Sequence, residues 1–429
     1  MPQKNDNVDR RKFLKTIGTV GLTSALAGAG NVFASHQPKA DSGEPNTIDP
    51  NTTEKSQTTK FEQVPRRKLG KTGIEVSCLS MGGGHNFVEN QIVLKVAIER
   101  GINYWHTGSD YEGGNSELGI GKFLSKNPQS RDKLFLASEP PRAEFVEKVA
   151  DMEGYLQTSL KRMNTNFLDW FGVHALSNPA QFTDELKQWA KGAKQRKLIR
   201  SFGFSTHTNM AECLAAAAKL DWIDVVMTSY NFRFMQDPKM QAALDVCHKA
   251  GIGIVAMKTQ GLRIYNLKIE TEEDKRLVRR FFERGFTEGQ AKIKVVLADE
   301  RISSACIGMY SVALLLENAA AALDKTKLTQ SDLAVFKEYA QATRNSYCAG
   351  CAHICDCALP DIPCISDVMR CLMYYNSYGR QDMAREVFAA IPRSVRDRLL
   401  TTDYSIAEAH CTQRLPIGAL VAEAVGKLA

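Results

Sequence analysis

The sequence has no long hydrophobic run and little excess charge. Beyond residue 34 there is no stretch of 18 uncharged apolar residues, so the mature protein is not expected to be an integral membrane protein. The formal net charge is +7, and residues 1–34 carry five Lys or Arg against two Asp, which leaves +4 for the rest. So small an excess argues against a nucleic-acid-binding protein.

The N-terminus carries the features of an export signal. Arg10 and Arg11 stand side by side, and a mildly apolar segment follows over residues 16–30, too short and too rich in Gly, Ala and Thr to span a bilayer. Val32-Phe33-Ala34 offers a cleavage site. These features predict a signal peptide over residues 1–34 that the twin-arginine (Tat) translocase reads, and hence a periplasmic protein. A basic N-terminal arm on a cytosolic protein is the alternative.

The Tat route carries folded proteins, often because a cofactor is inserted before transport. We therefore expect a metal centre downstream of the signal. Residues 35–62 are rich in Ser, Thr, Asn, Gln, Glu, Lys and Pro and nearly free of aliphatic side chains. This composition predicts a disordered linker between the signal and the folded body.

The central part of the chain alternates strand-like and helix-like segments. Apolar, β-rich runs occur at 76–82, 103–108, 134–139, 168–174, 199–205, 225–231, 253–258 and 303–309. Stretches between them, such as 91–100 and 144–163, have apolar residues at helical spacing. Eight such units over about 250 residues predict a (β/α)8 TIM barrel. A doubly wound open sheet is disfavoured because no G-x-G-x-x-G follows the first strand.

In such a barrel the chemistry lies at the carboxyl ends of the strands. The polar residues predicted there are Thr107, Glu139, His174, Thr206, Asn231 and Lys258.

An ordered set of motifs resembles the aldo/keto reductases. They are Arg67-Lys68-Leu69-Gly70 with Thr72-Gly73, Asn103-Tyr104-Trp105-His106-Thr107, Asn115-Ser116-Glu117-Leu118-Gly119, Gly203-Phe204-Ser205, Tyr230-Asn231, and Ile307-Gly308-Met309 with Leu316-Glu317-Asn318. The resemblance covers residues 63–325 and implies a barrel that reduces a carbonyl or oxidises an alcohol with NADP(H).

The resemblance also assigns catalytic positions, two of which are altered. Tyr111 stands at the proton donor and His174 at the substrate-orienting histidine. His106 replaces the usual Asp, and Glu139 replaces the Lys that makes the phenol more acidic, although a carboxylate would raise the pKa of Tyr111. A cation could be restored in two ways: Glu139 keeps His106 protonated, or Lys258 reaches across from the seventh strand.

The nicotinamide-binding positions are altered as well. Ser205 is retained, but Thr206 and Met227 occupy the other two carboxamide positions, and 309–312 contains no Lys or Arg for a 2′-phosphate. The residues that the resemblance leaves for a dinucleotide are Ser205, Tyr230, Gly308, Glu317 and Asn318. Tyr230 either stacks on a ring or packs in the barrel. Outside the cytoplasm, NADP(H) would have to be carried tightly bound.

The cysteines concentrate near the C-terminus, with seven of eleven after residue 347. Cys348, Cys351 and Cys355 form a C-x2-C-x3-C run that resembles the ferredoxin-like segment of some aldo/keto reductases. Relative to the bacterial ferredoxin run it has one inserted residue and no Pro after the last Cys. Cys411 looks like the last cysteine of a decayed second motif, which implies that these four thiolates hold one [4Fe–4S] cluster.

Three features complete the interpretation of residues 326–429 as a small, mostly helical Fe–S domain. Cys357 and Cys364 are spare candidate ligands, and Cys371 lies in an apolar, helix-like run. Helices are predicted at 367–375 and 385–389. Disulfides or a structural zinc site, with His353 in place of one thiolate, are the alternatives. The cluster is favoured because the export signal independently predicts an inserted cofactor.

The sequence thus predicts an exported oxidoreductase that acts on a small carbonyl or alcohol substrate and relays electrons through its cluster to or from a redox partner protein. The alternative is a non-catalytic barrel that serves as a periplasmic binding or electron-relay protein. Loss or diversion of hydride transfer is favoured by the altered positions His106, Glu139, Thr206 and Met227. Retained chemistry is favoured by Tyr111 and His174.

Overall fold

The computed structural model describes residues 61–141, 148–260, 279, 283–342, 348, 350, 352–377, 381–411 and 413–429. The predicted signal peptide and nearly all of the predicted linker lie outside this part of the chain. Over the described residues, no helix combines the length and the apolar character that crossing a membrane requires.

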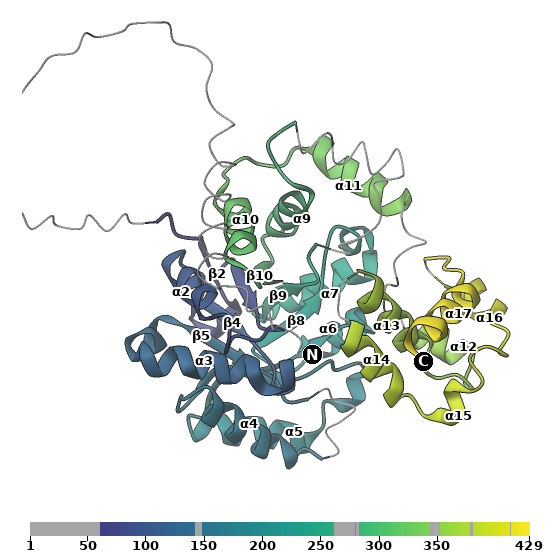
Figure 1. Ribbon diagram of the computed structural model, residues 1–429, viewed down its shortest axis with the longest axis horizontal. Coiled ribbons are helices and arrows are strands. Elements are labelled where there is room, and N and C mark those ends of the chain that lie inside the picture. Colours follow the sequence, from purple (N-terminus) through teal and green to yellow (C-terminus); the bar gives the residue numbers. More distant parts are fainter. Residues whose placement is uncertain are drawn as a thin grey trace, which may run out of the picture. The chain divides into compact units, whose positions relative to one another are not determined.

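Eight parallel strands form a closed barrel, which confirms the predicted TIM fold (Figure 1). They are β3 (Leu79–Gly82), β4 (Tyr104–His106), β5 (Phe135–Ser138), β6 (Leu168–Val173), β7 (Ile199–Thr206), β8 (Val225–Ser229), β9 (Gly253–Met257) and β10 (Ile302–Gly308). Pairing of β10 with β3 closes the ring. A hairpin of β1 (Arg66–Lys68) and β2 (Glu75–Ser77) precedes it.

Helices connect the strands. They are α2 (Gln91–Glu99), α3 (Asn115–Lys126), α4 (Asp151–Arg162), α5 (Asp184–Gln195), α6 (Met210–Ala217), α7 (Pro238–Lys249), α9 (Glu288–Leu297) and α10 (Val312–Leu323). Short 3-10 turns occur at Gly70–Thr72, Tyr111–Gly114, Pro128–Lys133, Pro179–Gln181 and Phe234–Gln236. Side chains such as Thr183 and Ser311 cap the first turns of α5 and α10 by accepting backbone N–H groups.

The barrel has two hydrophobic cores because alternate strand residues face opposite sides. One lies between strands and helices and includes Trp105, Phe171 and Phe204. The other fills the interior and includes Tyr104, Trp170, Met227, Met257 and Cys306. Such interior layers make the barrel a packed body with its chemistry at one end.

The packing of the barrel continues beyond residue 325. In α11 (Gln330–Ala342), Phe336 and Tyr339 belong to the outer core, and each ring centroid lies 5.5 Å from that of Phe232. The barrel unit therefore includes α11.

The C-terminal helices have a hydrophobic core of their own. They are α12 (Ala352–Ala358), α13 (Ile365–Ser377), α14 (Gln381–Ala390), α15 (Arg393–Arg396), α16 (Ser405–His410) and α17 (Ile417–Leu428). Val368, Phe388 and Val421 lie at the centre of this core, where α13 packs against α14 and α17, and α12 packs against α16. The helices predicted at 367–375 and 385–389 fall inside α13 and α14, and the predicted helical C-terminal region is confirmed.

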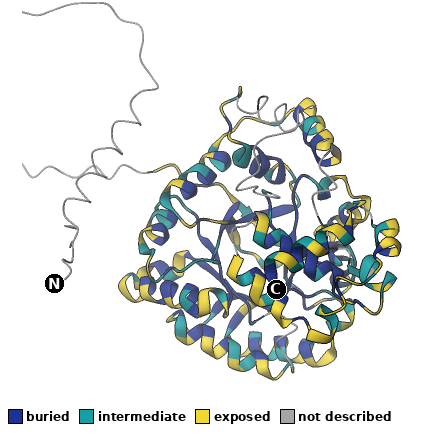
Figure 2. Ribbon diagram, turned by 45° about the vertical axis from the view of Figure 1, so that its right-hand side comes forward, coloured by how far each residue is buried: buried dark blue, intermediate teal, exposed yellow. Residues whose placement is uncertain are grey.

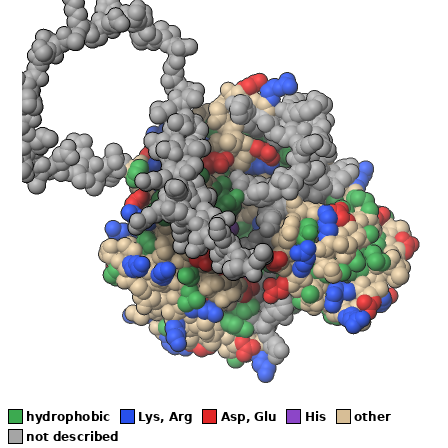
Figure 3. Space-filling model, in the orientation of Figure 1, with side chains coloured by type: hydrophobic (Ala, Val, Ile, Leu, Met, Phe, Trp, Pro, Cys, Tyr) green, Lys and Arg blue, Asp and Glu red, His purple; other side chains and the backbone are tan. Residues whose placement is uncertain are grey.

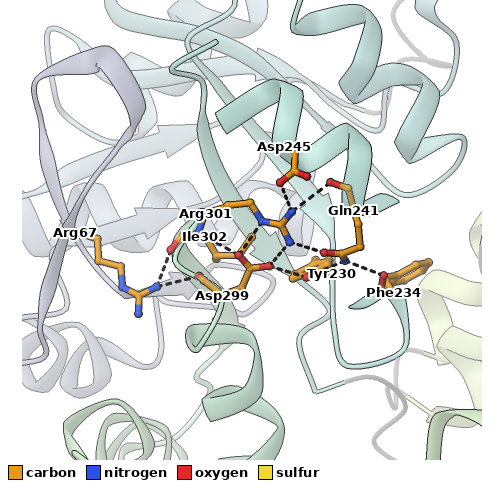
Figure 4. A network of polar contacts seen from close by, with 8 residues as sticks. All are labelled: Arg67, Tyr230, Phe234, Gln241, Asp245, Asp299, Arg301 and Ile302. Carbon is orange, nitrogen blue, oxygen red and sulfur yellow. Dashed lines mark hydrogen bonds and ion pairs between the residues drawn. The ribbon is translucent and has the colours of Figure 1, made fainter. Parts of the chain in front are cut away.

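A polar network ties β8, α7 and the start of β10 together (Figure 4). Arg301 donates to both carboxylate oxygens of Asp299 and to Asp245, and the Tyr230 hydroxyl donates to Asp299 at 2.7 Å. Burial would raise the pKa of Asp299, but hydrogen bonds from Arg301 and Tyr230 outweigh it and lower the pKa. Arg67 of β1 donates to the carbonyl oxygen of Ile302 at 2.8 Å.

This network predicts unequal losses of stability for two substitutions. Asp299→Ala leaves the Tyr230 hydroxyl and part of the Arg301 guanidinium without an acceptor, and should cost about 2–3 kcal/mol in the free energy of unfolding. Tyr230→Phe removes one hydrogen bond while Arg301 still neutralises Asp299, and should cost about 1 kcal/mol. Urea denaturation measures both, and equal losses would show that the ion pair contributes nothing beyond the hydroxyl contact.

Candidate active site

A cavity of about 710 Å³ opens at the carboxyl ends of the strands. His106, Met227, Met257 and Cys306 form its floor, from β4, β8, β9 and β10. The segment Gly82–His85, the loop after β4 and the residues after β9 form its sides. Its cover comes from Tyr374 of α13 and from Met383, Glu386 and Val387 of α14, and Figure 2 shows the C-terminal helices across this face of the barrel.

His106 and Glu139 form an ion pair at the bottom of the cavity. Nε2 of His106 lies 3.3 Å from Oε2 of Glu139, and the two side chains are only 4% and 1% exposed. Burial would lower the pKa of His106, but the neighbouring Cys306 and the Glu139 carboxylate outweigh it and raise the pKa to about 10. His106 is therefore a cation at neutral pH. This geometry agrees with the first of the two expected ways to place a cation near Tyr111, in which Glu139 keeps His106 protonated.

Tyr111 lies between two histidines. Its ring centroid is 6.3 Å from that of His106 and 5.8 Å from that of His174. Burial, and after it the charge of Glu139, raise the pKa of Tyr111 well above its ordinary value. Tyr111 is therefore a neutral phenol that needs a nearby cation to act as an acid.

His174 is oriented by the backbone. Its Nδ1 lies 3.1 Å from the carbonyl oxygen of Pro140, which can only accept, so Nδ1 carries the hydrogen. Nε2 lies 3.9 Å from Oε2 of Glu139. His106, Tyr111, Glu139 and His174 are thus brought together.

The turn that begins at Tyr111 is held by Arg162. Glu112, Gly113 and Gly114 all have positive φ, and Cβ at Gly114 would come 2.7 Å from the guanidinium carbon of Arg162. This guanidinium donates to the carbonyl oxygen of Ser109 at 2.7 Å and to Oε2 of Glu117 at 3.2 Å. The turn therefore places Tyr111 at the cavity through a backbone that only glycine adopts easily at residue 114.

Lys258 lines the same cavity and has a φ of +56°. Its Nζ lies 5.0 Å from the centre of the Tyr374 ring, a cation–π contact between the barrel and α13. The residue thus joins the side of the cavity to its cover. A part in proton transfer stays a prediction.

The polar groups at the nicotinamide positions are used within the barrel. Oγ of Ser205 accepts the backbone N–H of Ala175 at 2.9 Å, and Oγ1 of Thr206 donates to the carbonyl oxygen of Thr208. Met227 faces the cavity. Tyr230 is fully buried, and its hydroxyl binds Asp299, which is the arrangement expected of a packing residue.

The residues at the adenine positions suit a bound dinucleotide better than those at the nicotinamide positions. Glu317 accepts the Thr287 hydroxyl at 2.8 Å, and Gly308 lines the cavity. Asn318 is 1% exposed, its Oδ1 accepts from Gln260 at 3.4 Å, and its Nδ2 has no hydrogen-bond partner within the described part of the chain. A buried amide donor of this kind suits a ligand acceptor.

Three of the four predicted cluster ligands are described, and Cys351 lies outside the described residues. Cys348, Cys355 and Cys411 are partly buried and pack against the C-terminal core. Cys355 belongs to α12 and Cys411 follows α16, which packs on α12, so these two cysteines come from neighbouring elements. The backbone N–H of Leu415 donates to Sγ of Cys411 at 3.4 Å.

The remaining C-terminal cysteines differ in exposure. Cys357 is exposed, Cys371 is fully buried, and burial raises the pKa of Cys364 to about 12, which disfavours the thiolate that a metal requires. Among the described residues, no three side chains of His, Cys, Asp or Glu converge on a metal position. A set of partly buried thiols is nevertheless the donor chemistry of an Fe–S cluster.

Sequence reasoning missed Cys306 and the whole cover of the cavity. The alternation along 303–309 could have placed Cys306 on the interior face, because Ile307 and Ala305 face the outer core. No local signal places Tyr374 and α14 over the barrel, since this depends on tertiary packing. Figure 3 shows the surface of the molecule in the orientation of Figure 1, where a histidine (purple) is visible near acidic side chains (red).

Residues 79–339 match the model of the aldo/keto reductase family, and the chain belongs to this family. The aldo-keto reductase AFTS1 of Alternaria alternata is 22% identical over 315 residues, which cover 59% of this chain and 86% of that protein. Among solved structures, the holo form of aldo-keto reductase AKR11C1 from Bacillus halodurans has a TM-score of 0.53 at 20% identity, covering 64% of this chain and 96% of that one.

A second solved structure is the thermostable aldo-keto reductase Tm1743 in complex with the inhibitor epalrestat. It has a TM-score of 0.53 at 25% identity and covers 64% of this chain and 99% of its own. These similarities confirm the barrel and define the protein as an oxidoreductase of the aldo/keto reductase type.

The ion pair predicts the titration of His106. NMR of its ring C–H should give a pKa of about 10. Glu139→Gln should lower this pKa well below 10, because burial lowers it and the carboxylate that opposed this effect is then gone. Since the folded-state pKa is raised, His106 stabilises the fold fully below pH 6.5 and loses this contribution as the pH rises through about 10.

Glu112→Gln is the matched control, because it removes a carboxylate at the cavity that is not among the groups that raise the pKa of His106. It should leave the pKa of His106 near 10. A similar decrease in both variants would mean that the general charge of the cavity, and not the 3.3 Å contact, holds the proton.

Proposed function

We propose that this protein interconverts a carbonyl and an alcohol in the cavity at the barrel mouth, with the His106–Glu139 pair in place of the usual Asp–Lys pair. The observation that carries the proposal is the position of this pair beside Tyr111 and His174 on the cavity floor. The Tyr111 phenol, which can donate a hydrogen bond to a carbonyl oxygen, and the His174 ring line the same cavity.

The proton chemistry follows from the charges. A cationic imidazole close to Tyr111 stabilises the phenolate that remains after the proton has moved to the carbonyl oxygen, as an ammonium would. Glu139 keeps the imidazole protonated and at the same time disfavours the phenolate. The pair is therefore a weaker activator of Tyr111 than an isolated cation.

NADP(H) fits the site in part. When bound, a nicotinamide supplies or accepts the hydride at the carbonyl carbon. Asn318 would meet the adenine end through its unpartnered Nδ2, whereas the Ser205 hydroxyl at the carboxamide position already accepts the backbone N–H of Ala175. Met227 offers no hydrogen bond there, so we propose that binding is weak, or that the dinucleotide is carried firmly inside the folded protein.

Electrons reach or leave the site through the C-terminal domain in this proposal, by a [4Fe–4S] cluster on Cys348, Cys351, Cys355 and Cys411. A small cavity lined by Cys348, Lys258 and Tyr374 supports a relay, because Lys258 and Tyr374 also line the main cavity. The Gly350 carbonyl oxygen accepts the N–H of Asn209 at 2.9 Å and so attaches the chain at Gly350, two residues after Cys348, to the barrel.

The location completes the proposal. The twin-arginine sequence at Arg10 and Arg11 supports export to the periplasm after the cluster has been inserted. A partner protein there would exchange electrons with the cluster. Free NADP(H) is not expected in the periplasm, so in this proposal the cluster supplies or removes the electrons.

The proposal predicts the metal content of anaerobically purified protein. It should contain about four irons with matching sulfide. Cys411→Ser should lose the iron as fully as Cys348→Ser, because each removes one of four thiolates. Cys371→Ser is the matched control and should keep the iron, since Cys371 is buried in the C-terminal core. Stoichiometric zinc without iron would refute the cluster.

It also predicts the effect of reversing the charge pair. Turnover of simple aldehydes with NADPH should be roughly 10²- to 10⁴-fold below that of an ordinary aldo/keto reductase, since the cation that tunes Tyr111 is compensated by Glu139. His106→Asp with Glu139→Lys should raise this turnover.

Each single substitution should do little, because it leaves one buried charge without its partner 3.3 Å away. Initial rates of NADPH oxidation measure all four proteins. Ordinary turnover in the unmodified protein would show that other residues transfer the proton.

A further inference from the structure

Cys306 lies at the carboxyl end of β10, on the floor of the cavity. Its side chain belongs to the barrel interior together with Tyr104 and Met257. The barrel's other cysteines, Cys78, Cys213 and Cys247, belong to the outer core and do not line the cavity. Burial raises the pKa of Cys78 to about 11 and those of Cys213 and Cys247 to about 12, so these three thiols are chemically inert at neutral pH.

The strand register explains why Cys306 meets the ion pair. Ser80 of β3 pairs with Cys306 on one side and with Tyr104 on the other. Tyr104 and His106 are separated by Trp105, which faces the outer core, so both face the interior. In a barrel, alternate strands supply the side chains of one interior layer, and β10 and β4 are alternate strands. Cys306 therefore neighbours His106 across β3.

Buried polar atoms around this cysteine have no hydrogen-bond partner among the described residues. They are Oγ of Ser80, the Tyr104 hydroxyl and Oε1 of Glu139, and all three side chains are at most 1% exposed. Buried polar groups are nearly always satisfied, so this set points to a polar ligand group or water that completes it. Cys306 is thus one member of a cluster that also holds a histidine and a carboxylate.

We propose that Cys306 is a nucleophile that adds to the carbonyl carbon of an aldehyde in this cavity and forms a thiohemiacetal. The substrate class rests on the proposed function, whereas the reactivity of the thiol rests on the cluster itself. A nucleophile, an acid–base group and a carboxylate that orients it recur in enzymes that form covalent intermediates.

The step is balanced without an oxidant or reductant. The bond between Sγ and the carbonyl carbon forms as the π bond of the carbonyl opens. The protonated imidazole of His106 gives its proton to the carbonyl oxygen and takes the proton that leaves the thiol. One proton has then moved from sulfur to oxygen, and His106 ends the step as the cation that it was at the start. The raised pKa of His106 agrees with this role.

The test uses the full-length protein and acetaldehyde labelled with ¹³C at its carbonyl carbon. NMR should show a thiohemiacetal carbon in the unmodified protein and none in Cys306→Ala. Cys213→Ala is the matched control: it removes a buried cysteine outside the cavity, and the signal should remain. His106→Gln should slow the appearance of the signal roughly 10²-fold, because the acid–base group is lost.

A labelling experiment on the unmodified protein guards against a variant that fails to fold. Iodoacetamide should alkylate Cys306, and acetaldehyde should protect it, as measured by peptide mass spectrometry. The exposed Cys357 is the internal reference and should not be protected. Absence of the NMR signal in the unmodified protein, its persistence in Cys306→Ala, or equal protection of both cysteines would overturn the proposal.

The outcomes separate this proposal from the proposed function. Aldehyde turnover without any adduct would leave the oxidoreductase assignment standing and remove the role of Cys306. An adduct on Cys306 without aldehyde turnover would leave the nucleophile and refute the interconversion of carbonyl and alcohol.

Discussion

Pairing of β10 with β3 is the constraint on which the candidate active site depends. It joins residues 305–308 to 79–82, more than two hundred positions away in the sequence, with Gly308 opposite Gly82 at the mouth. Cβ at Gly82 would lie 3.2 Å from the carbonyl oxygen of Ile307, so the strands approach closely there. Because the barrel closes in this register, its interior holds Cys306 and His106 together with the unpartnered atoms of Ser80 and Tyr104.

The second constraint is charge. At the positions that the resemblance assigns to the family's lysine and carboxylate stand Glu139 and His106, so the sign of the charge at each position is reversed while the sum of the two charges is kept. A buried carboxylate and imidazolium 3.3 Å apart neutralise each other, and removing either one would leave the other charge buried without its partner. In the proposed function, this pair keeps the floor of the cavity ionised without the family's usual two residues.

The sequence predicts all eight barrel strands, because buried parallel strands are short apolar runs bounded by turns. It also predicts two ways to restore a cation near Tyr111, through the His106–Glu139 pair or through Lys258, because all three residues lie at the carboxyl ends of barrel strands. Tyr230 was ambiguous, because only tertiary contacts reveal its bond to Asp299. The cover by α14 could not be predicted, since the hydrophobic pattern of 381–390 shows that a face is buried but not against what.

The cover has a consequence for biosynthesis. A ribosome releases every strand of the barrel before α13 and α14, and domains generally fold in the order in which they emerge. The barrel mouth is therefore open while the chain grows and is covered only after α13 and α14 have been synthesised. A molecule that binds deep in the cavity could therefore enter before α13 and α14 have folded.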